Sequence, residues 1–354
     1  MKIAISGGLG FIGSRLAERY AEMGHEVSVL DNLHPQVHAD DRDLKRVSQF
    51  ARVIVGDVRS ANDWHTVLNG AELVLHMAAE TGTGQSMSDI TRYCDVNVTG
   101  TAQLAESLLH HPTVQRVFLP SSRAIYGEGA YRCIDHGIVL PSRRDKHTME
   151  RGIFSLACPI CGLEATAIPT SEETEARPCS VYASTKLSQE QILQLACENT
   201  GRSLRIARYQ NVFGPGQSLR NAYTGVLAIF SAQIERGEVL DIYEDGKISR
   251  DFIYVDDVVR ATMRLIETSG DPGPVNIGTG RASSLFDVIA AFGAAFDRPV
   301  PHEVTGHFRY GDIRHAVADT ARANAVGIQA PTTLDHGIRE LAAWVSRALP
   351  ASAP

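Results

Sequence analysis

The chain has 354 residues, which is enough for one large α/β domain and a smaller second one. Its formal net charge of −7 disfavours a nucleic-acid surface, which is normally basic. The sequence contains neither a basic-apolar leader nor an apolar run of about 18 residues, so we expect a cytoplasmic protein without a membrane span, whose six cysteines are thiols or metal ligands.

The first half of the chain alternates short apolar strands with amphipathic helices. This alternation predicts a parallel sheet with helices on both faces, that is, an α/β fold of the Rossmann-type doubly wound kind. The expected strands lie at 2–6, 26–30, 52–55, 73–76, 114–120 and 204–209, and the expected helices at 11–23, 97–109 and 181–199.

Residues 128–177 interrupt this alternation with a polar, turn-rich segment that contains cysteines, and we interpret them as an insertion. The insertion falls within a predicted dinucleotide-binding domain at 1–210. We expect a smaller mixed α/β substrate lobe at 211–350, with part of 245–265 returning to the first domain. Helices are predicted there at 225–236 and 255–268, with strands near 240–243 and 275–277.

A glycine motif joins the first predicted strand to the first helix. Gly7, Gly10 and Gly13 would permit a tight turn whose backbone amides approach a pyrophosphate at the helix N-terminus. Asp31 ends the second strand, where a carboxylate accepts hydrogen bonds from a ribose diol and repels a 2′-phosphate. The motif therefore predicts NAD rather than NADP, against the alternative of an ordinary strand-turn-helix. Asp57, at the end of the third strand, is a candidate for contacting the adenine or for a simple turn.

A tyrosine and a lysine four residues apart suggest acid–base chemistry. Tyr182 and Lys186 would share one face of a helix, where a nearby ammonium favours the phenolate and allows the tyrosine to act as a general base. Ser122 follows a predicted strand and would hydrogen-bond the reacting oxygen. The alternatives are a chance pair and a turn-forming serine.

The order and spacing of these motifs resemble the extended short-chain dehydrogenases/reductases of the nucleotide-sugar epimerase/dehydratase group, over nearly the whole chain. The resemblance implies a catalytic triad of Ser122, Tyr182 and Lys186, in which Tyr182 takes a proton from a sugar hydroxyl while hydride passes to NAD. Further matching motifs lie at 56–58, 76–79, 97–101, 208–216, 250–255 and 276–278.

The resemblance also implies the ligand contacts, with arginines suited to paired hydrogen bonds with a diphosphate. Surface ion pairs are the alternative for these arginines. Phe230 and Tyr223 are candidates for packing the nucleotide base, although an aromatic residue in a helix more often belongs to the core. The implied substrate contacts are Ser122, Arg123, Tyr182, Asn211, Arg250 and Arg309. The implied cofactor contacts are Gly7, Gly10, Phe11, Ile12, Gly13, Asp31, Asn32, Asp57, Val58, Ala78, Ala79, Asn97, Tyr182 and Lys186.

The residues after Ser122 separate the reactions of this group. Dehydratases in it carry an Asp-Glu pair there, whereas this chain has Arg123 and Ala124, which excludes dehydration. We therefore expect a 4-epimerase acting through a transient 4-keto-sugar. The alternatives are a keto-sugar reductase or dehydrogenase with net redox, and a non-catalytic NAD-sensing protein.

The insertion contains two pairs of potential metal ligands. Cys133 and His136 form one pair, and Cys158 and Cys161 form the other. Four such ligands suit tetrahedral Zn²⁺ and leave no open position, so the predicted metal is structural. A redox pair and unligated cysteines are the alternatives.

The insertion resembles that of a bacterial subgroup described as dTDP-L-rhamnose 4-epimerases, which implies a dTDP-hexose substrate. The resemblance further implies a homodimer through the helices at 97–109 and 181–199. Cys179, three residues before Tyr182, is expected near the substrate rather than on the metal.

Overall fold

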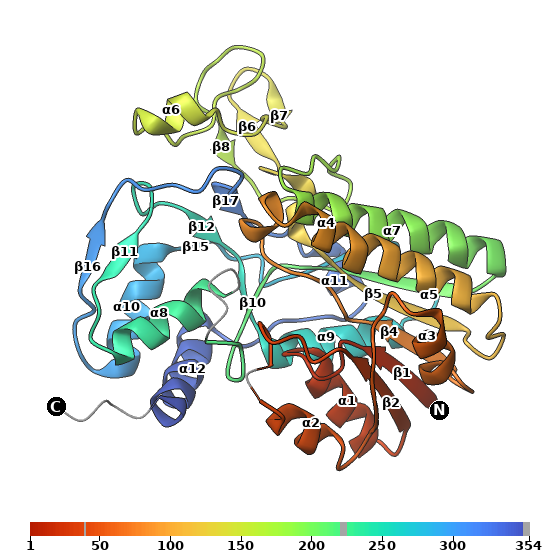
Figure 1. The fold of residues 1–354 in the computed structure, drawn as a ribbon. Helices are drawn as coiled ribbons and strands as arrows, with labels where there is room; N and C mark the ends of the chain where they lie inside the picture. Colours follow the sequence, from red (N-terminus) through yellow and green to blue (C-terminus); the bar gives the residue numbers. More distant parts are fainter. Residues whose placement is uncertain (39, 220–224, 350–354) are drawn as a thin grey trace. The chain divides into compact units, whose positions relative to one another are not determined.

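The computed structural model describes residues 1–38, 40–219 and 225–349, and these form two compact units (Figure 1). Tyr223 lies outside the described residues. In the part of the chain described, no helix combines the length and apolar character needed to cross a membrane. The first unit consists of Met1–Ser122, Val181–Arg208 and Val259–Val275, and the second contains the remaining described residues.

A seven-stranded sheet occupies the centre of the first unit. Its strands are β1 (Lys2–Ser6), β2 (Glu26–Asp31), β3 (Arg52–Val55), β4 (Leu73–His76), β5 (Arg116–Ser122), β9 (Ser203–Tyr209) and β14 (Val275–Ile277). Their order is β14-β9-β5-β4-β1-β2-β3, and the pairings among β1 to β5 are parallel. Strand β4 is buried throughout, as expected for a strand covered on both faces.

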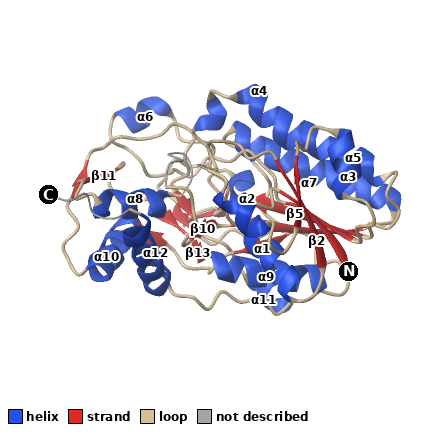
Figure 2. Ribbon diagram, turned by 60° about the horizontal axis from the view of Figure 1, so that its bottom comes forward, coloured by secondary structure: helices blue, strands red, loops and turns tan. Residues whose placement is uncertain are grey.

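Helices cover both faces of this sheet. They are α1 (Gly13–Glu22), α2 (Arg42–Val47), α3 (Ala61–Val67), α4 (Ile90–Tyr93), α5 (Gly100–Leu108), α7 (Val181–Thr200) and α9 (Val255–Glu267). Figures 1 and 2 both show α5 and α7 on one face and α1 and α9 on the other. The predicted doubly wound Rossmann-type fold is confirmed.

The chain between α4 and α5 departs from the single helix predicted there. Residues Cys94–Thr99 (η2) form a π-helical turn, flanked by α4 and α5. A π turn takes more residues than an α turn, and hydrophobic periodicity does not reveal it. Short 3₁₀ turns lie at Gln85–Met87 (η1) and Arg123–Tyr126 (η3).

The second unit has its own core of packed helices and short strands. Helices α8 (Val226–Glu235), α10 (Leu285–Phe296) and α12 (Leu334–Ala348) pack together around buried side chains such as Phe292 and Leu341. Parallel pairs join β10 (Asn211–Phe213) to β13 (Phe252–Tyr254) and β11 (Leu240–Ile242) to β16 (His302–Val304). The remaining elements are β15 (Ser283–Ser284), β12 (Ser249–Arg250), β17 (His315–Ala316) and α11 (Ala321–Ala325).

The inserted segment belongs to the second unit, although in sequence it lies between two parts of the first. The main-chain N–H of Thr170 donates to the carbonyl of Val317, and the N–H of Asp319 donates back to Thr170. These contacts join segments about 150 residues apart, so sequence order does not reveal them. The insertion contains β6 (Tyr131–Cys133), β7 (Gly137–Val139), β8 (Thr166–Ala167) and α6 (Lys146–Glu150).

Candidate functional site

The glycine turn between β1 and α1 forms a cradle with no room for side chains. Gly7 has a φ of +65°, and a Cβ there would lie 2.6 Å from the amide nitrogen of Ala78. A Cβ on Gly13 would lie 2.2 Å from the carbonyl oxygen of Gly7. Phe11 and Ile12 precede the first residue of α1, so their amides lie in the turn at the helix N-terminus. This geometry fits a pyrophosphate bound by backbone amides.

The turn itself is closed by main-chain hydrogen bonds around Gly10. The N–H of Gly10 donates to the carbonyl of Gly7 at 3.2 Å, and the carbonyl of Gly10 accepts from Ser14. Arg15 donates to the carbonyl of Phe11 at 2.7 Å and stacks over its ring. These contacts fix the turn to the first residues of α1.

Asp31 ends β2 with its carboxylate fixed by three groups. It accepts from the amides of Leu9 and Leu33, both at 3.0 Å, and its Oδ1 lies 3.4 Å from Nε2 of His38. The other ring nitrogen of His38 lies 3.5 Å from Asp43. Burial alone lowers the pKa of His38, but the two carboxylates outweigh it and raise the pKa to about 9. A buried imidazolium therefore links Asp31 to Asp43.

Two further predicted cofactor residues lie at the end of β3. The carboxylate of Asp57 is held by Arg59 through contacts of 2.7 and 2.8 Å, which lower its pKa to about 2. Val58 is buried, and its carbonyl accepts from the indole of Trp64. Asn32 follows β2 and accepts from the amide of His34 through its side chain.

The segment after β4 is held by a buried asparagine from the π turn. The side chain of Asn97 accepts from the amide of Glu80 at 2.8 Å and donates to its carbonyl at 3.1 Å. The same amide group donates to Thr185 on α7 at 2.9 Å. Ala78 and Ala79, predicted cofactor residues in this segment, are partly buried. Asn97 therefore links the segment after β4 to the helix that carries Tyr182.

The predicted triad lies on two elements that pack together. Ser122 is the last residue of β5, and Tyr182 and Lys186 lie in the first turns of α7, which packs against that strand. The ring of Tyr182 meets the edge of Tyr93 with a centroid distance of 6.5 Å. Lys186 is only 3% exposed, and burial lowers its pKa to about 7 despite the opposing charge of Glu190.

A buried chain of hydrogen bonds leads away from the lysine. Nζ of Lys186 donates to Gln189 at 2.6 Å, and the amide of Gln189 donates to Oγ1 of Thr101 at 2.7 Å. Nε2 of His76 lies 2.9 Å from the same hydroxyl, and Nδ1 lies 2.8 Å from Oγ of Ser6. Because Thr101 uses its own proton on the carbonyl of residue 97, it accepts from both neighbours, which places the imidazole proton on Nε2.

Arginines of the second unit gather around one carboxylate. Arg123 donates to Asn211 at 3.0 Å, and the buried Arg250 pairs with Asp312 at 2.9 Å. Both arginines lower the pKa of Asp312, against the effect of burial. Arg309, in contrast, is exposed and stacks on an aromatic ring, that of Tyr243.

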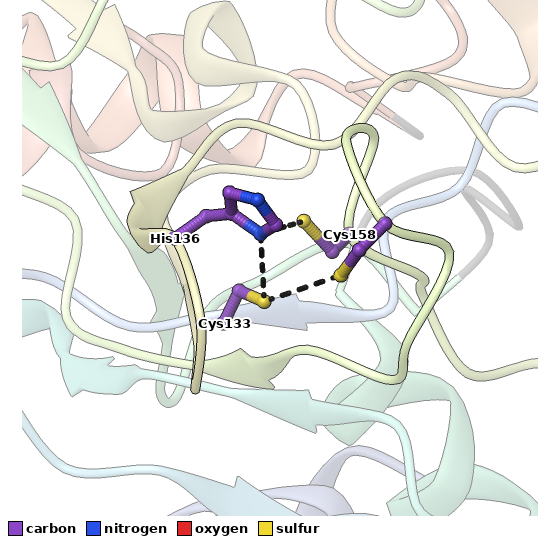
Figure 3. A group of neighbouring side chains, drawn as sticks. Cys133, His136 and Cys158 are labelled. Atoms are coloured by element: carbon purple, nitrogen blue, oxygen red, sulfur yellow. Dashed lines mark hydrogen bonds between the residues drawn. The ribbon is translucent and has the colours of Figure 1, made fainter.

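The four predicted metal ligands converge within the insertion. Their ligand atoms all lie within 4.8 Å of one another. Sγ of Cys133 is 3.6 Å from both Nδ1 of His136 and Sγ of Cys161, and Sγ of Cys158 is 3.8 Å from that nitrogen. Tetrahedral bonds of about 2.3 Å to sulfur and 2.0 Å to nitrogen give ligand separations of about 3.5 to 3.8 Å, so the donor set fits Zn²⁺. Figure 3 shows Cys133, His136 and Cys158 pointing toward one another.

Four residues that the sequence did not single out contribute to these sites. Gln189 lies one helical turn after Lys186, and that spacing was a usable signal. Asp251 is buried and accepts from the amides of residues 279, 280 and 318, and its position within the motif at 250–255 does not by itself indicate this role. His38 and Arg144 carry no local sequence signal, because their partners are set by the tertiary fold.

A Rossmann-type sheet with a glycine cradle, an acidic residue ending β2 and a tyrosine–lysine helix defines a nicotinamide-dinucleotide enzyme of the dehydrogenase type. Residues 3–278 match the NAD dependent epimerase/dehydratase family. The chain belongs to this family.

Individual relatives of the chain are nucleotide-sugar epimerases. It is 39% identical to a dTDP-L-rhamnose 4-epimerase of Burkholderia thailandensis, over 98% of this chain and 96% of that protein. A UDP-glucose 4-epimerase of Mycolicibacterium smegmatis is 28% identical, over 96% of both chains. Among solved structures, the UDP-glucose 4-epimerase of Thermotoga maritima with UDP-glucose is 27% identical at a TM-score of 0.80, covering 99% of this chain and all of that one. That of Thermus thermophilus in complex with NAD is 25% identical at a TM-score of 0.78, with the same coverage.

Proposed function

We propose that this chain is an NAD-dependent nucleotide-sugar 4-epimerase acting on a dTDP-hexose such as dTDP-L-rhamnose. The observation that carries the proposal is the 39% identity, over nearly the full length of both chains, to a relative with that activity in its name. The pair Arg123 and Ala124 supports it, because neither side chain can replace the acidic pair of a dehydratase.

The proposed chemistry divides among three side chains. The phenol oxygen of Tyr182 takes the proton of the sugar C4 hydroxyl, and the ammonium of Lys186 favours the phenolate form. The hydroxyl of Ser122 hydrogen-bonds the reacting oxygen. When bound, NAD would supply the hydride acceptor for oxidation at C4 and the hydride donor for reduction of the 4-keto-sugar from its other face, so the product would show no net oxidation.

The proposed ligand contacts fall into a cofactor set and a substrate set. The cradle of Gly7, Gly10 and Gly13 would hold the pyrophosphate of NAD, and Asp31 its adenosine ribose. The remaining proposed cofactor contacts are Phe11, Ile12, Asn32, Asp57, Val58, Ala78, Ala79, Asn97, Tyr182 and Lys186. The proposed substrate contacts are Ser122, Arg123, Tyr182, Asn211, Arg250 and Arg309.

The metal of the insertion is proposed to be a structural Zn²⁺ held by Cys133, His136, Cys158 and Cys161. The ligand separations support this, and so does the small apolar cluster of the insertion, which includes two of the ligands themselves. Four protein ligands leave no position for substrate. Elemental analysis of freshly purified protein should find about one equivalent of zinc, and less than half an equivalent would contradict the assignment.

A homodimer is proposed through α5 and α7. The two helices pack against each other, and Leu109 and Leu195 next to or on them are exposed. Light scattering should give twice the chain mass, and a monomer at micromolar concentration would contradict it.

The activity is tested with a panel of nucleotide-hexoses, following the configuration at C4 by NMR. We expect interconversion of a dTDP-hexose with no lasting absorbance change at 340 nm, and loss of turnover with retained NAD binding in Tyr182→Phe. A stoichiometric change at 340 nm would indicate a net reductase or dehydrogenase instead. Bound NAD without conversion of any sugar would indicate a non-catalytic protein.

A further inference from the structure

The insertion contributes a buried arginine to the rest of the second unit. Arg144 lies in the 21-residue loop between His136 and Cys158, and its side chain is 4% exposed. Its Nη1 atom donates to both carboxylate oxygens of Glu244 at 2.8 Å, and its Nε atom donates to Glu128 at 3.2 Å. The fourth polar contact, at 2.9 Å, is a donation to the main-chain carbonyl of Asp312.

The residue that Arg144 binds is also the one that holds Arg250. The carboxylate of Asp312 accepts from Arg250 at 2.9 Å and from the amide of Ile313 at 2.8 Å. Arg250 in turn donates to the carbonyl of Arg314 at 3.2 Å. One short segment, 312–314, therefore touches the insertion through its backbone and Arg250 through its side chain and backbone.

Two more contacts from the insertion reach the same segment. Glu128 accepts from the amide of Arg314 at 2.9 Å, and just before the segment Arg143 stacks over the ring of Tyr310 at 4.3 Å. Arg314 completes the ion cluster by contacting Glu244 at 2.7 Å. Buried charges of this kind persist only when each has its partner. Removing Arg144 takes the cation from Glu128 and the donor from the carbonyl of Asp312, while Glu244 keeps Arg314, so the segment loses part of its support.

We propose that the insertion orients the substrate-diphosphate site, with Arg144 as the positioning residue that fixes segment 312–314 beneath Arg250. The inference rests on the proposed function, in which Arg250 contacts the diphosphate. A metal held by the four Cys/His ligands would close the loop that carries Arg144 and restrict its conformations. The insertion is thereby a determinant of nucleotide-sugar affinity, although it contributes no residue to the proposed chemistry.

The test compares Arg144→Met with Arg132→Met, which removes the same charge from an exposed position on β6 of the same insertion. Calorimetry with thymidine diphosphate should show about tenfold or weaker binding for Arg144→Met and no change for Arg132→Met. NAD affinity and zinc content should match the wild type in both. Arg144→Lys keeps the charge but has one donor nitrogen in place of the three that reach Glu128, Glu244 and Asp312, and it should be intermediate.

A second experiment removes the metal from the wild-type protein with a chelator. The treated protein should lose thymidine-diphosphate affinity and keep NAD affinity. Unchanged thymidine-diphosphate binding in Arg144→Met would overturn the inference. If that variant loses NAD binding as well, it has misfolded, and Arg144→Lys takes its place in the test. Unchanged thymidine-diphosphate binding in Arg144→Lys would then overturn the inference. Absence of thymidine-diphosphate binding in the wild type would instead contradict the proposed substrate, so the two failures are distinguishable.

Discussion

At the scale of single residues, the molecule contains ionisable groups whose burial changes their chemistry. His38 lies between two carboxylates, whereas Lys186 is buried and hydrogen-bonds the neutral amide of Gln189, so their pKa values move in opposite directions. Each gives a prediction that does not depend on the identity of the sugar.

His38→Gln should destabilise the protein by about 1 to 3 kcal/mol at pH 6, because it leaves Asp31 and Asp43 close together without a cation. The folded-state pKa of His38 is raised to about 9, so its contribution is complete below the unfolded pKa of about 6.5 and is lost as the pH rises through 9. Urea unfolding of both proteins from pH 6 to 10 measures this difference.

Burial of Lys186 acts with the opposite sign over the same range, since its folded-state pKa is lowered. Only the difference between wild type and variant therefore isolates His38. A difference that stays constant from pH 6 to 10 would show that His38 is neutral in the folded protein.

In the wild type, kcat should fall as the pH rises and Lys186 loses its charge. Gln189→Glu should raise the pH of this fall by about one to three units, because a carboxylate beside Lys186 favours its charged form. Gln194→Glu makes the same change at an exposed position of α7 and should leave the profile unchanged. Gln189→Leu should lower kcat without raising the pH at which kcat falls. Identical pH–rate profiles for Gln189→Glu and the wild type would refute a link between the two side chains.

At the scale of secondary-structure elements, the most constrained connection is the glycine turn before α1. Gly7 and Gly24 both have positive φ values, +65° and +80°, but only Gly7 has backbone atoms where a Cβ would be. Gly24 has no atom within 4 Å of that position, so it is a matched control for conformational strain alone.

Gly24→Ala should cost about 1 kcal/mol, the price of a left-handed alanine. Gly7→Ala should cost about 3 kcal/mol and abolish NAD binding, because the clash with Ala78 adds to the same strain. Denaturant unfolding and NAD titration measure both. Equal losses of stability for the two variants would mean that the turn has room to relax.

Many of the secondary-structure elements were predictable from the sequence. Strands β1, β3 and β4 lie at the residues predicted, because short apolar runs bounded by turn residues are a strong signal. Helix α1 begins at Gly13 and not at 11, since the first residues of the motif form the turn. The π turn at Cys94–Thr99 has no counterpart in hydrophobic periodicity, which does not specify how many residues a turn contains.

At the scale of the whole molecule, the long-range contacts could not be predicted from the sequence. The convergence of Cys133, His136, Cys158 and Cys161 was predictable because each pair is local and its spacing is typical of metal ligands. The contact between Arg144 and Glu244 spans 100 residues, and nothing in the sequence near either residue names the other. The same holds for the hydrogen bonds between the insertion and residues 312–319.

NAD at about 100 times its Kd should stabilise the protein by about 2.7 kcal/mol and raise the melting temperature, because it binds only the folded cradle. NADP at the same concentration should give little stabilisation, since the carboxylate of Asp31 repels a 2′-phosphate. Thermal unfolding with each cofactor measures this. Equal melting temperatures with NAD and NADP would remove Asp31 as the selective residue.

The π turn also bears on how the gene tolerates short deletions. Tyr93, Asn97 and Thr101 are four residues apart. In a regular helix of 3.6 residues per turn, side chains at this spacing point in successively different directions. The wider turn offsets this change of direction, so that the first two bind the main chain of residues 80–82 and the third binds His76. Deleting one residue from 94–96 would restore a regular helix and yet turn Tyr93 away from its partners. In a library of single-codon deletions, the change that makes this helix most ordinary should therefore be among the least tolerated.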